Sequence, residues 1–218
     1  MIRLSIDTSF ENLSLCITKN NFPLGNFFSS GNRNNSKIIF DVIDDLLKYS
    51  GIKLSDIDVY IINCGPGSYT GVRIGMAVVK TFSQVYKKPI IPVNSLELIA
   101  GQMKHSNDEF HVLLNCTRRE IFYAKFKTVD DHPILKSPIF LTDLEKYIES
   151  SNDMPVVLHR VNPERRNPEP MFDLLKKIKL DLPIPDAILL DILGARKFFK
   201  PSFNRELPVH PLYIKREL

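Results

Sequence analysis

The most informative stretch of this 218-residue sequence reads GPGSYTGVRIG, from Gly65 to Gly75. It lies between a short apolar run, residues 58–64, which predicts a buried strand, and a segment over residues 70–86 that predicts a helix. Glycines allow the backbone to turn with positive φ and to approach another group closely. The N-terminus of a helix offers free N–H groups and a partial positive charge. We therefore expect this loop to bind a phosphate or a carboxylate, with Thr70 capping the helix and Arg73 adding a positive charge.

Known phosphate and nucleophile motifs do not fit this loop. A P-loop requires Gly-Lys-Ser/Thr after four intervening residues, and Val72-Arg73 follows Gly71 here. The third glycine comes one residue late for a dinucleotide-binding fingerprint. Ser68 lacks the glycines two residues before and after that a nucleophile elbow has. A turn that only joins strand to helix stays open as the alternative.

The segment after the loop is apolar around most of the helix circumference. Such a helix is either buried on all sides or covered by a partner. Because Gly71 and Gly75 are four residues apart, another backbone could approach this helix closely, so we predict a protein–protein interface. The alternative is a central core helix. The predicted interface residues are Ile39, Ile43, Val72, Gly75, Met76, Val79 and Phe82. On this prediction, Gly75→Arg or Val79→Glu would abolish partner binding and leave the fold intact.

Working outward from the loop, the pattern predicts an α/β protein with mixed sheets. Strands at residues 2–8, 12–18 and 24–29 should form an antiparallel meander, followed by a helix at 36–49. A strand at 90–93 and a helix at 95–103 complete a first lobe, residues 1–105. The second lobe, residues 106–218, is expected to be smaller. Its predicted strands are 110–115, 120–127, 134–139 and 154–158, and its predicted helices are 142–149 (capped by Thr142), 172–180 and 187–199, with an irregular loop at 161–170.

Composition narrows the functional class. Apolar residues make up 44% and charged residues 25% of the chain, with a net charge of +4. Cys16, Cys64 and Cys116 form no closely spaced pair, and no two of the five histidines share the i, i+4 spacing of ligands on one helix face. No metal site is predicted. The N-terminal segment does not have the composition of a signal peptide, so a cytoplasmic location away from membranes is expected.

Polar residues at the end of the first strand are the remaining candidates for a site. Asp7, Thr8 and Ser9 lie where phosphate-handling folds place polar groups. The sequence offers no acid/base pair for them, so no catalytic residue is assigned. A turn cap is the alternative reading. The full set of predicted anion or nucleotide contacts is Asp7, Thr8, Ser9, Gly65, Gly67, Ser68, Thr70 and Arg73.

Several of these segments together resemble the TsaB (YeaZ) family. The resemblance rests on the first strand ending in Ile6-Asp7-Thr8-Ser9 and on the stretch from Gly65 to Gly75. It is supported by Pro92-Val93-Asn94-Ser95-Leu96-Glu97, by Glu120-Ile121-Phe122 and by Pro211-Leu212-Tyr213-Ile214-Lys215. The similarity runs along the whole chain and is strongest up to Ala100. The chain departs from the family at Asn35-Ser36, where His-Ser is common, and at Asn115-Cys116-Thr117, where Asp-Ala-Arg is common.

The resemblance implies the two-lobed fold of the sugar kinase and actin superfamily, which is RNase H-like. It further implies a non-catalytic scaffold for TsaD, the subunit that transfers threonylcarbamoyl to the tRNA adenosine beside the anticodon. Family members act together with the ATPase TsaE, and they pair through helices of the first lobe, either with TsaD or as homodimers. Contact with tRNA would be indirect, through the complex. No cofactor should bind this chain tightly by itself, although ATP or ADP could bind in the complex.

Two enzymatic alternatives remain at this point. One is a stand-alone nucleotide-dependent phosphotransferase that uses Asp7, Thr8 and the loop from Gly65 to Gly71. The other is a glycoprotease-like peptidase, for which the sequence shows neither a metal site nor a nucleophile constellation. Tight magnesium-dependent ATP binding by the isolated chain would favour the phosphotransferase over the scaffold.

Overall fold

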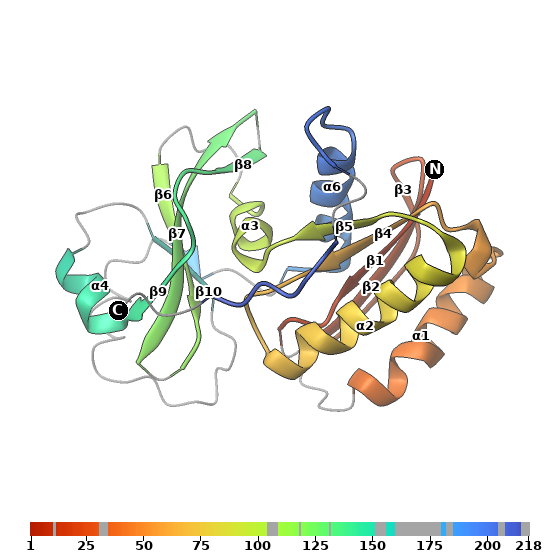
Figure 1. The fold of residues 1–218 in the computed structure, drawn as a ribbon, viewed down its shortest axis with the longest axis horizontal. Helices are drawn as coiled ribbons and strands as arrows, with labels where there is room; N and C mark the ends of the chain where they lie inside the picture. Colours follow the sequence, from red (N-terminus) through yellow and green to blue (C-terminus); the bar gives the residue numbers. More distant parts are fainter. Residues whose placement is uncertain are drawn as a thin grey trace. The chain divides into compact units, whose positions relative to one another are not determined.

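The computed structural model describes residues 1–10, 12–30, 35–103, 109–117, 119–130, 132–150, 156–159, 180–181, 185–204 and 208–214. The chain divides into two compact units (Figure 1). Unit 1 contains Met1–Ser95 and Pro185–Leu212, and unit 2 contains Leu96–Ile184 and Tyr213–Leu218. The expected first lobe, residues 1–105, therefore differs from unit 1 in two respects. Residues 96–103 belong to unit 2, and residues 185–212 belong to unit 1 because a helix from late in the chain packs on the first sheet.

Unit 1 is built on a five-stranded mixed sheet in the order β3-β2-β1-β4-β5. Strands β1 (Ile2–Asp7), β2 (Asn12–Lys19) and β3 (Phe22–Ser30) form the expected antiparallel meander. Strands β4 (Val59–Asn63) and β5 (Ile90–Val93) run parallel to β1. The sequence predicted all five strands to within about two residues, because each shows alternation or a short apolar run between turn residues.

Helices cover both faces of this sheet. Helices α1 (Asn35–Ser50) and α2 (Tyr69–Tyr86) lie on one face, and α6 (Ala187–Phe198) packs on β1, β2, β4 and β5 from the other (Figure 1). The side chains of β1, which point alternately to the two faces of the sheet, explain this arrangement of helices. Leu4 and Ile6 join the core beneath α1 and α2, whereas Arg3 and Ser5 contact Asp191 of α6.

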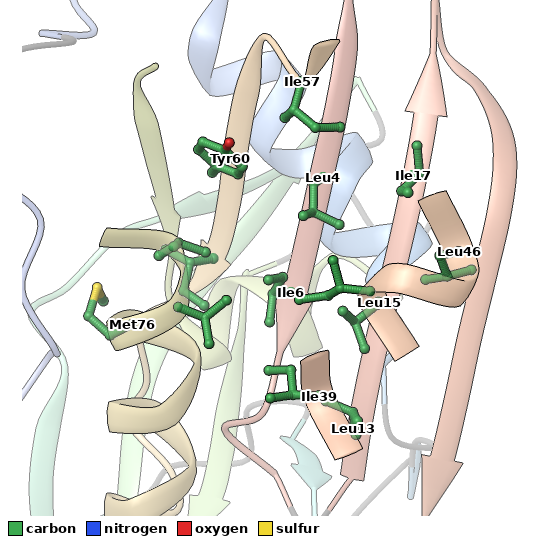
Figure 2. Close-up of a cluster of buried hydrophobic side chains, with 14 of the residues drawn as sticks. Leu4, Ile6, Leu13, Leu15, Ile17, Ile39, Leu46, Ile57, Tyr60 and Met76 are labelled. Carbon is green, nitrogen blue, oxygen red and sulfur yellow. The ribbon is translucent and has the colours of Figure 1, made fainter. Parts of the chain in front are cut away.

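The core between the sheet and the α1/α2 layer is a continuous apolar cluster. Figure 2 shows side chains from three strands and both helices meeting there, with Tyr60 and Met76 at one end and Leu46 at the other. Most of these side chains are almost completely shielded from solvent. Burying a large aliphatic side chain stabilises a fold by about 1.5–3 kcal/mol, so this cluster is the main support of unit 1.

Unit 2 contains a six-stranded sheet whose main path is β11-β10-β6-β7-β8, with β9 also paired to β7. The strands are β6 (Glu109–Asn115), β7 (Glu120–Val129), β8 (His132–Leu135), β9 (Phe140–Asp143), β10 (Val156–His159) and β11 (Leu180–Asp181). Where one strand was expected at residues 134–139, the chain forms β8 and β9 instead. Two short helices are α3 (Ser95–Ala100) and α4 (Leu144–Ser150). Unit 1 also contains the short helical turn η1 (Leu54–Asp56).

Between residues 142 and 180, the structure differs from one prediction and does not describe the residues of another. Thr142 belongs to β9 and is not the cap of α4, because the strand continues to Asp143 before the helix begins. The predicted loop at 161–170 and most of the predicted helix at 172–180 lie outside the described residues. None of the described helices is long and apolar enough to cross a membrane.

Candidate functional site

The glycine-rich loop joins the end of β4 to the start of α2. Asn63, the last residue of β4, accepts a hydrogen bond at Oδ1 from the N–H of Gly65 at 3.0 Å. Gly65 has a φ of 92°, which favours glycine. Helix α2 begins at Tyr69, and its N-cap is Ser68, whose Oγ accepts from the N–H of Gly71. The prediction that Thr70 caps the helix was wrong, because the helix begins one residue before it.

The loop is held tightly against the turn between β1 and β2. The N–H of Ser68 donates to the carbonyl of Ser9 at 2.7 Å, and the hydroxyl of Thr8 donates to the carbonyl of Gly71 at 2.7 Å. A Cβ at Gly67 would overlap the Ser9 carbonyl oxygen, and a Cβ at Gly71 would overlap the Thr8 carbonyl oxygen. These glycines therefore permit two backbone segments of the same chain to touch.

Asp7 lies at the centre of a buried polar network. Its Oδ1 accepts from the N–H of Ser9 at 2.8 Å and from the Ser9 hydroxyl at 2.7 Å, and its Oδ2 accepts from Nδ2 of Asn63 at 3.2 Å. The hydroxyl of Ser95, the first residue of α3, donates to Oδ1 of Asn63 at 2.9 Å. All four residues are fully shielded from solvent. The network ties together the carboxyl ends of β1 and β4 and the segment that follows β5.

Burial controls the electrostatics of this network. Burial raises the pKa of the Asp7 carboxyl above its ordinary value, and the hydrogen bonds from Ser9 and Asn63 oppose part of that increase. The groups that donate to Asp7 are a neutral amide, a hydroxyl and a backbone N–H. A shielded carboxylate with satisfied oxygens can anchor a turn, and it has no contact with solvent through which to move a proton.

The structure separates the predicted anion-contact residues into two groups. Six of them lie together within or beside the network: Asp7, Thr8, Ser9, Gly65, Gly67 and Ser68. Thr70 and Arg73 lie on the exposed side of the first turns of α2, where the Arg73 guanidinium is 3.8 Å from the centre of the Tyr69 ring. Such a cation–π contact is worth about 0.5–1 kcal/mol at an exposed position.

Sequence reasoning missed Asn63 and Ser95. A signal for both was present, since each lies at the carboxyl end of a parallel strand, the edge where polar residues of open α/β sheets gather. Asn63 stands directly before Cys64-Gly65, and Ser95 follows Val93-Asn94. Reading polar residues at all parallel strand ends would have found both.

Most of the predicted interface residues are buried inside this chain, so the prediction that they face a partner was wrong. Ile39, Ile43, Val72, Met76 and Val79 are each at most 3% exposed within this chain's own core, and Gly75 is also buried. A Cβ at Gly75 would lie 2.5 Å from the Thr8 hydroxyl and 2.9 Å from Ile62. The close approach that the glycines permit is therefore to β1 and β4. It follows that Gly75→Arg and Val79→Glu would disrupt the fold itself.

The outer side of the α1/α2 layer carries exposed apolar side chains that a partner protein could contact. Phe82, the seventh predicted residue, is partly exposed and contacts Phe40 of α1 edge to face, with ring centres 6.4 Å apart. Phe40 is 54% exposed and Val85 of α2 is 65% exposed. We call Phe40, Phe82 and Val85 the outer apolar patch.

Comparison with known proteins identifies the family. A family model described as "TsaD: tRNA N6-adenosine threonylcarbamoyltransferase" matches residues 26–134, which is half of the chain. The Bacillus subtilis protein named "tRNA threonylcarbamoyladenosine biosynthesis protein TsaB" is 28% identical over 127 residues, covering 58% of this chain and 56% of that protein. The Escherichia coli protein of the same name is 30% identical over 126 residues, covering 57% and 54%. This chain belongs to the TsaB (YeaZ) family.

Solved structures agree with the TsaB assignment at the level of the fold. A Pseudomonas aeruginosa structure described as an uncharacterized protein with similarity to peptidase YEAZ superposes with a TM-score of 0.80 at 17% identity, covering 98% of this chain and 99% of that one. The structure titled "YeaZ from Pseudomonas aeruginosa" gives 0.77 at 18% identity, with the same coverage. The expected mixed sheets flanked by helices are confirmed, and the fold is that of these YeaZ structures. The matched segments span just over half the length of the curated TsaB relatives.

Proposed function

We propose that this chain acts in the synthesis of threonylcarbamoyladenosine in tRNA, as a non-catalytic scaffold that binds the catalytic subunit TsaD. The match to relatives named for this biosynthesis is the observation that carries the proposal. TsaE joins the pair in a ternary complex, and tRNA is reached through the complex. The cytoplasm is where this tRNA modification would take place.

The geometry of the Asp7 network supports a structural role for the loop. In a phosphotransferase of this fold, Asp7 and the loop would have to face the nucleotide and its metal. Here the carboxylate oxygens accept from Ser9 and Asn63, and the loop is held by Ser9 and Thr8. In this role the chain by itself binds no nucleotide tightly, and ATP or ADP binds only in the assembled complex.

The outer apolar patch is the surface that we assign to TsaD. Exposed aromatic and aliphatic side chains grouped on two packed helices suit a partner interface. Helix α1 also carries exposed carboxylates at Asp41 and Asp44. They favour a partner surface with basic residues, which would speed association at low salt. Without TsaD, the same patch pairs two copies of the chain.

Reconstitution tests the function directly. Purified synthase, TsaD and TsaE from the same organism are combined with tRNA, ATP, threonine and bicarbonate, with and without this chain. We expect threonylcarbamoyladenosine only when the chain is present. Equal product in its absence, from partners shown to be active, would reject the scaffold role. Tight magnesium-dependent ATP binding by the isolated chain would then support the phosphotransferase.

Two variants test the assigned surface. Phe40→Arg and Val85→Arg place a charge in the outer apolar patch and should weaken TsaD binding at least tenfold, because an interfacial charge without a partner is costly. Phe199→Arg is the control, since Phe199 is a similarly exposed aromatic residue, 67%, just beyond α6. Binding by isothermal calorimetry that is equal for all three variants would contradict the assignment.

A further inference from the structure

In the part of the chain that the structure describes, strand β3 is an edge of the first sheet, and much of its length lacks the features that protect an edge strand. It runs for nine residues at the end of the strand order, and none of its residues is charged. Natural proteins protect such edges with charges, proline or bulges, because unpaired N–H and C=O groups can recruit another strand. Pro23 and a register irregularity beside it protect only the start of β3. From Gly25 onward the strand has neither device, and Phe28 is 44% exposed.

A groove follows this edge and is lined from both faces of the sheet. Its volume is about 560 Å³, and β3 contributes five consecutive residues from Pro23 to Phe27. Val42, Leu46 and Tyr49 of α1 line one side, and Ile188 of α6 lines the other. A volume of this size lies within the range of ligand-binding pockets, about 300–1,000 Å³. A chain added beside β3 would therefore find apolar side chains above and below it.

We propose that this groove binds an extended segment of a partner protein, which pairs with β3 as a sixth strand. Main-chain hydrogen bonds to the strand edge would supply affinity, and a large apolar side chain in the groove would supply specificity, as in other cases of strand addition. A β-branched or aromatic residue next to Phe28 would form a favourable cross-strand pair. This inference concerns a second surface and does not depend on the proposed function.

Charge indicates the chemistry of the segment. Asp45 is the charged residue among the described ones that line the groove, and its side chain is 82% exposed. Lys48 lies 4.0 Å away and is also exposed, so this pair is weak and Asp45 can engage a second cation. A bound segment should therefore carry a lysine or arginine near its apolar anchor. A second copy fits less well, because pairing two β3 strands would bring the carboxylates of two α1 helices towards each other.

Peptide selection with the intact protein tests the proposal. A displayed library of random nine-residue peptides is selected on the full chain, and enriched peptides are measured by fluorescence anisotropy. We expect alternating β-branched or aromatic residues with at least one lysine or arginine. Asp45→Lys should raise the Kd at least tenfold, whereas Asp44→Lys, a neighbouring exposed carboxylate outside the groove lining, should leave the Kd within twofold. Phe28→Lys and Asn26→Lys, two exposed edge positions, should each abolish binding in a protein with an unchanged circular dichroism spectrum.

Backbone pairing needs its own readout. Hydrogen exchange of β3 amides should slow at least tenfold when a selected peptide binds, and peptides with alternate amides N-methylated should not bind. Failure to enrich peptides over the Phe28→Lys protein would overturn the proposal, as would binding that survives N-methylation. A concentration-dependent dimer that Phe28→Lys dissociates, without peptide binding, would overturn it in favour of a second copy at this edge.

Discussion

Close contacts with backbone carbonyl oxygens explain why glycines are needed in the loop between β4 and α2. Gly71 lies in the first turn of α2, where the Thr8 carbonyl oxygen occupies the space of a side chain. Helix propensity alone favours alanine there by about 1 kcal/mol. Packing makes alanine unfavourable at this position, because the backbone oxygen of Thr8 cannot move aside without shifting β1.

We therefore expect Gly71→Ala to lower the free energy of unfolding by about 2 kcal/mol or more, measured by urea denaturation. Thr81→Ala on the exposed side of the same helix is the control and should change it by less than about 1 kcal/mol. A stabilised Gly71→Ala protein would show that the loop does not hold this close contact in solution.

Asp7 gives a prediction for the pH dependence of stability. Because its pKa is raised in the folded protein, the folded state binds more protons than the unfolded state between the two pKa values. Stability from Asp7 is thus present at low pH and is lost as the pH rises through the folded pKa. We expect the unfolding free energy of the native protein, minus that of Asp7→Asn, to fall from pH 4 upward, by at most about 1.4 kcal/mol per pH unit. A difference that increases with pH would mean that the bonds from Ser9 and Asn63 outweigh burial.

At the scale of elements, α6 is fixed to the sheet by a buried ion pair. Arg3 of β1 binds Asp191 with both ends of its guanidinium fork, with Nε to Oδ1 at 2.9 Å and a terminal nitrogen to Oδ2 at 2.6 Å. Ser5 and Thr18 also donate to Asp191. Both members of the pair are at most 3% exposed. Removing one partner leaves an uncompensated buried charge, whereas replacing both with apolar residues can be neutral.

Asp191→Ala should therefore cost about 3–5 kcal/mol of unfolding free energy. The double variant Arg3→Met/Asp191→Leu should recover most of that loss, and a guanidinium titration of all three proteins measures both changes. A double variant as unstable as Asp191→Ala would mean that the ion pair itself, with its hydroxyl donors, is required.

The elements also show what a single sequence can predict. Periodicity located α1, α2 and α6 closely, because each has an apolar stripe long enough to be unambiguous. It could not say what covers the apolar sides of α2, since β1, β4 and a partner protein would all leave the same pattern in the sequence. Asp191 stands 188 residues from Arg3, so no local pattern connects them. Asn63 lies 56 residues from Asp7, and Ser95 lies 32 residues from Asn63, so no local pattern joined them to the site, although both follow a recognisable rule of strand ends.

At the scale of the whole molecule, unit 1 is assembled from two separate stretches of chain. Gly194 of α6 packs so closely on Ile61 of β4 that an added Cβ would overlap the isoleucine side chain, so the helix is an integral layer of that unit. A chain truncated after residue 184 would lose this layer and leave Arg3 unpaired. We expect the truncated protein to lack a cooperative thermal transition for unit 1, as measured by calorimetry. A transition at the native temperature would show that α6 is dispensable.

The split composition of unit 1 also has a consequence during synthesis on the ribosome. Residues 96–184 must be translated between the two halves, which takes on the order of 4–18 s at about 5–20 residues per second. Throughout that interval the nascent strands of unit 1 have no α6 to cover Ile61 or to pair the charge of Arg3. Chaperone demand should therefore peak late in translation, and slow codons placed before residue 185 should increase aggregation more than slow codons placed after residue 198.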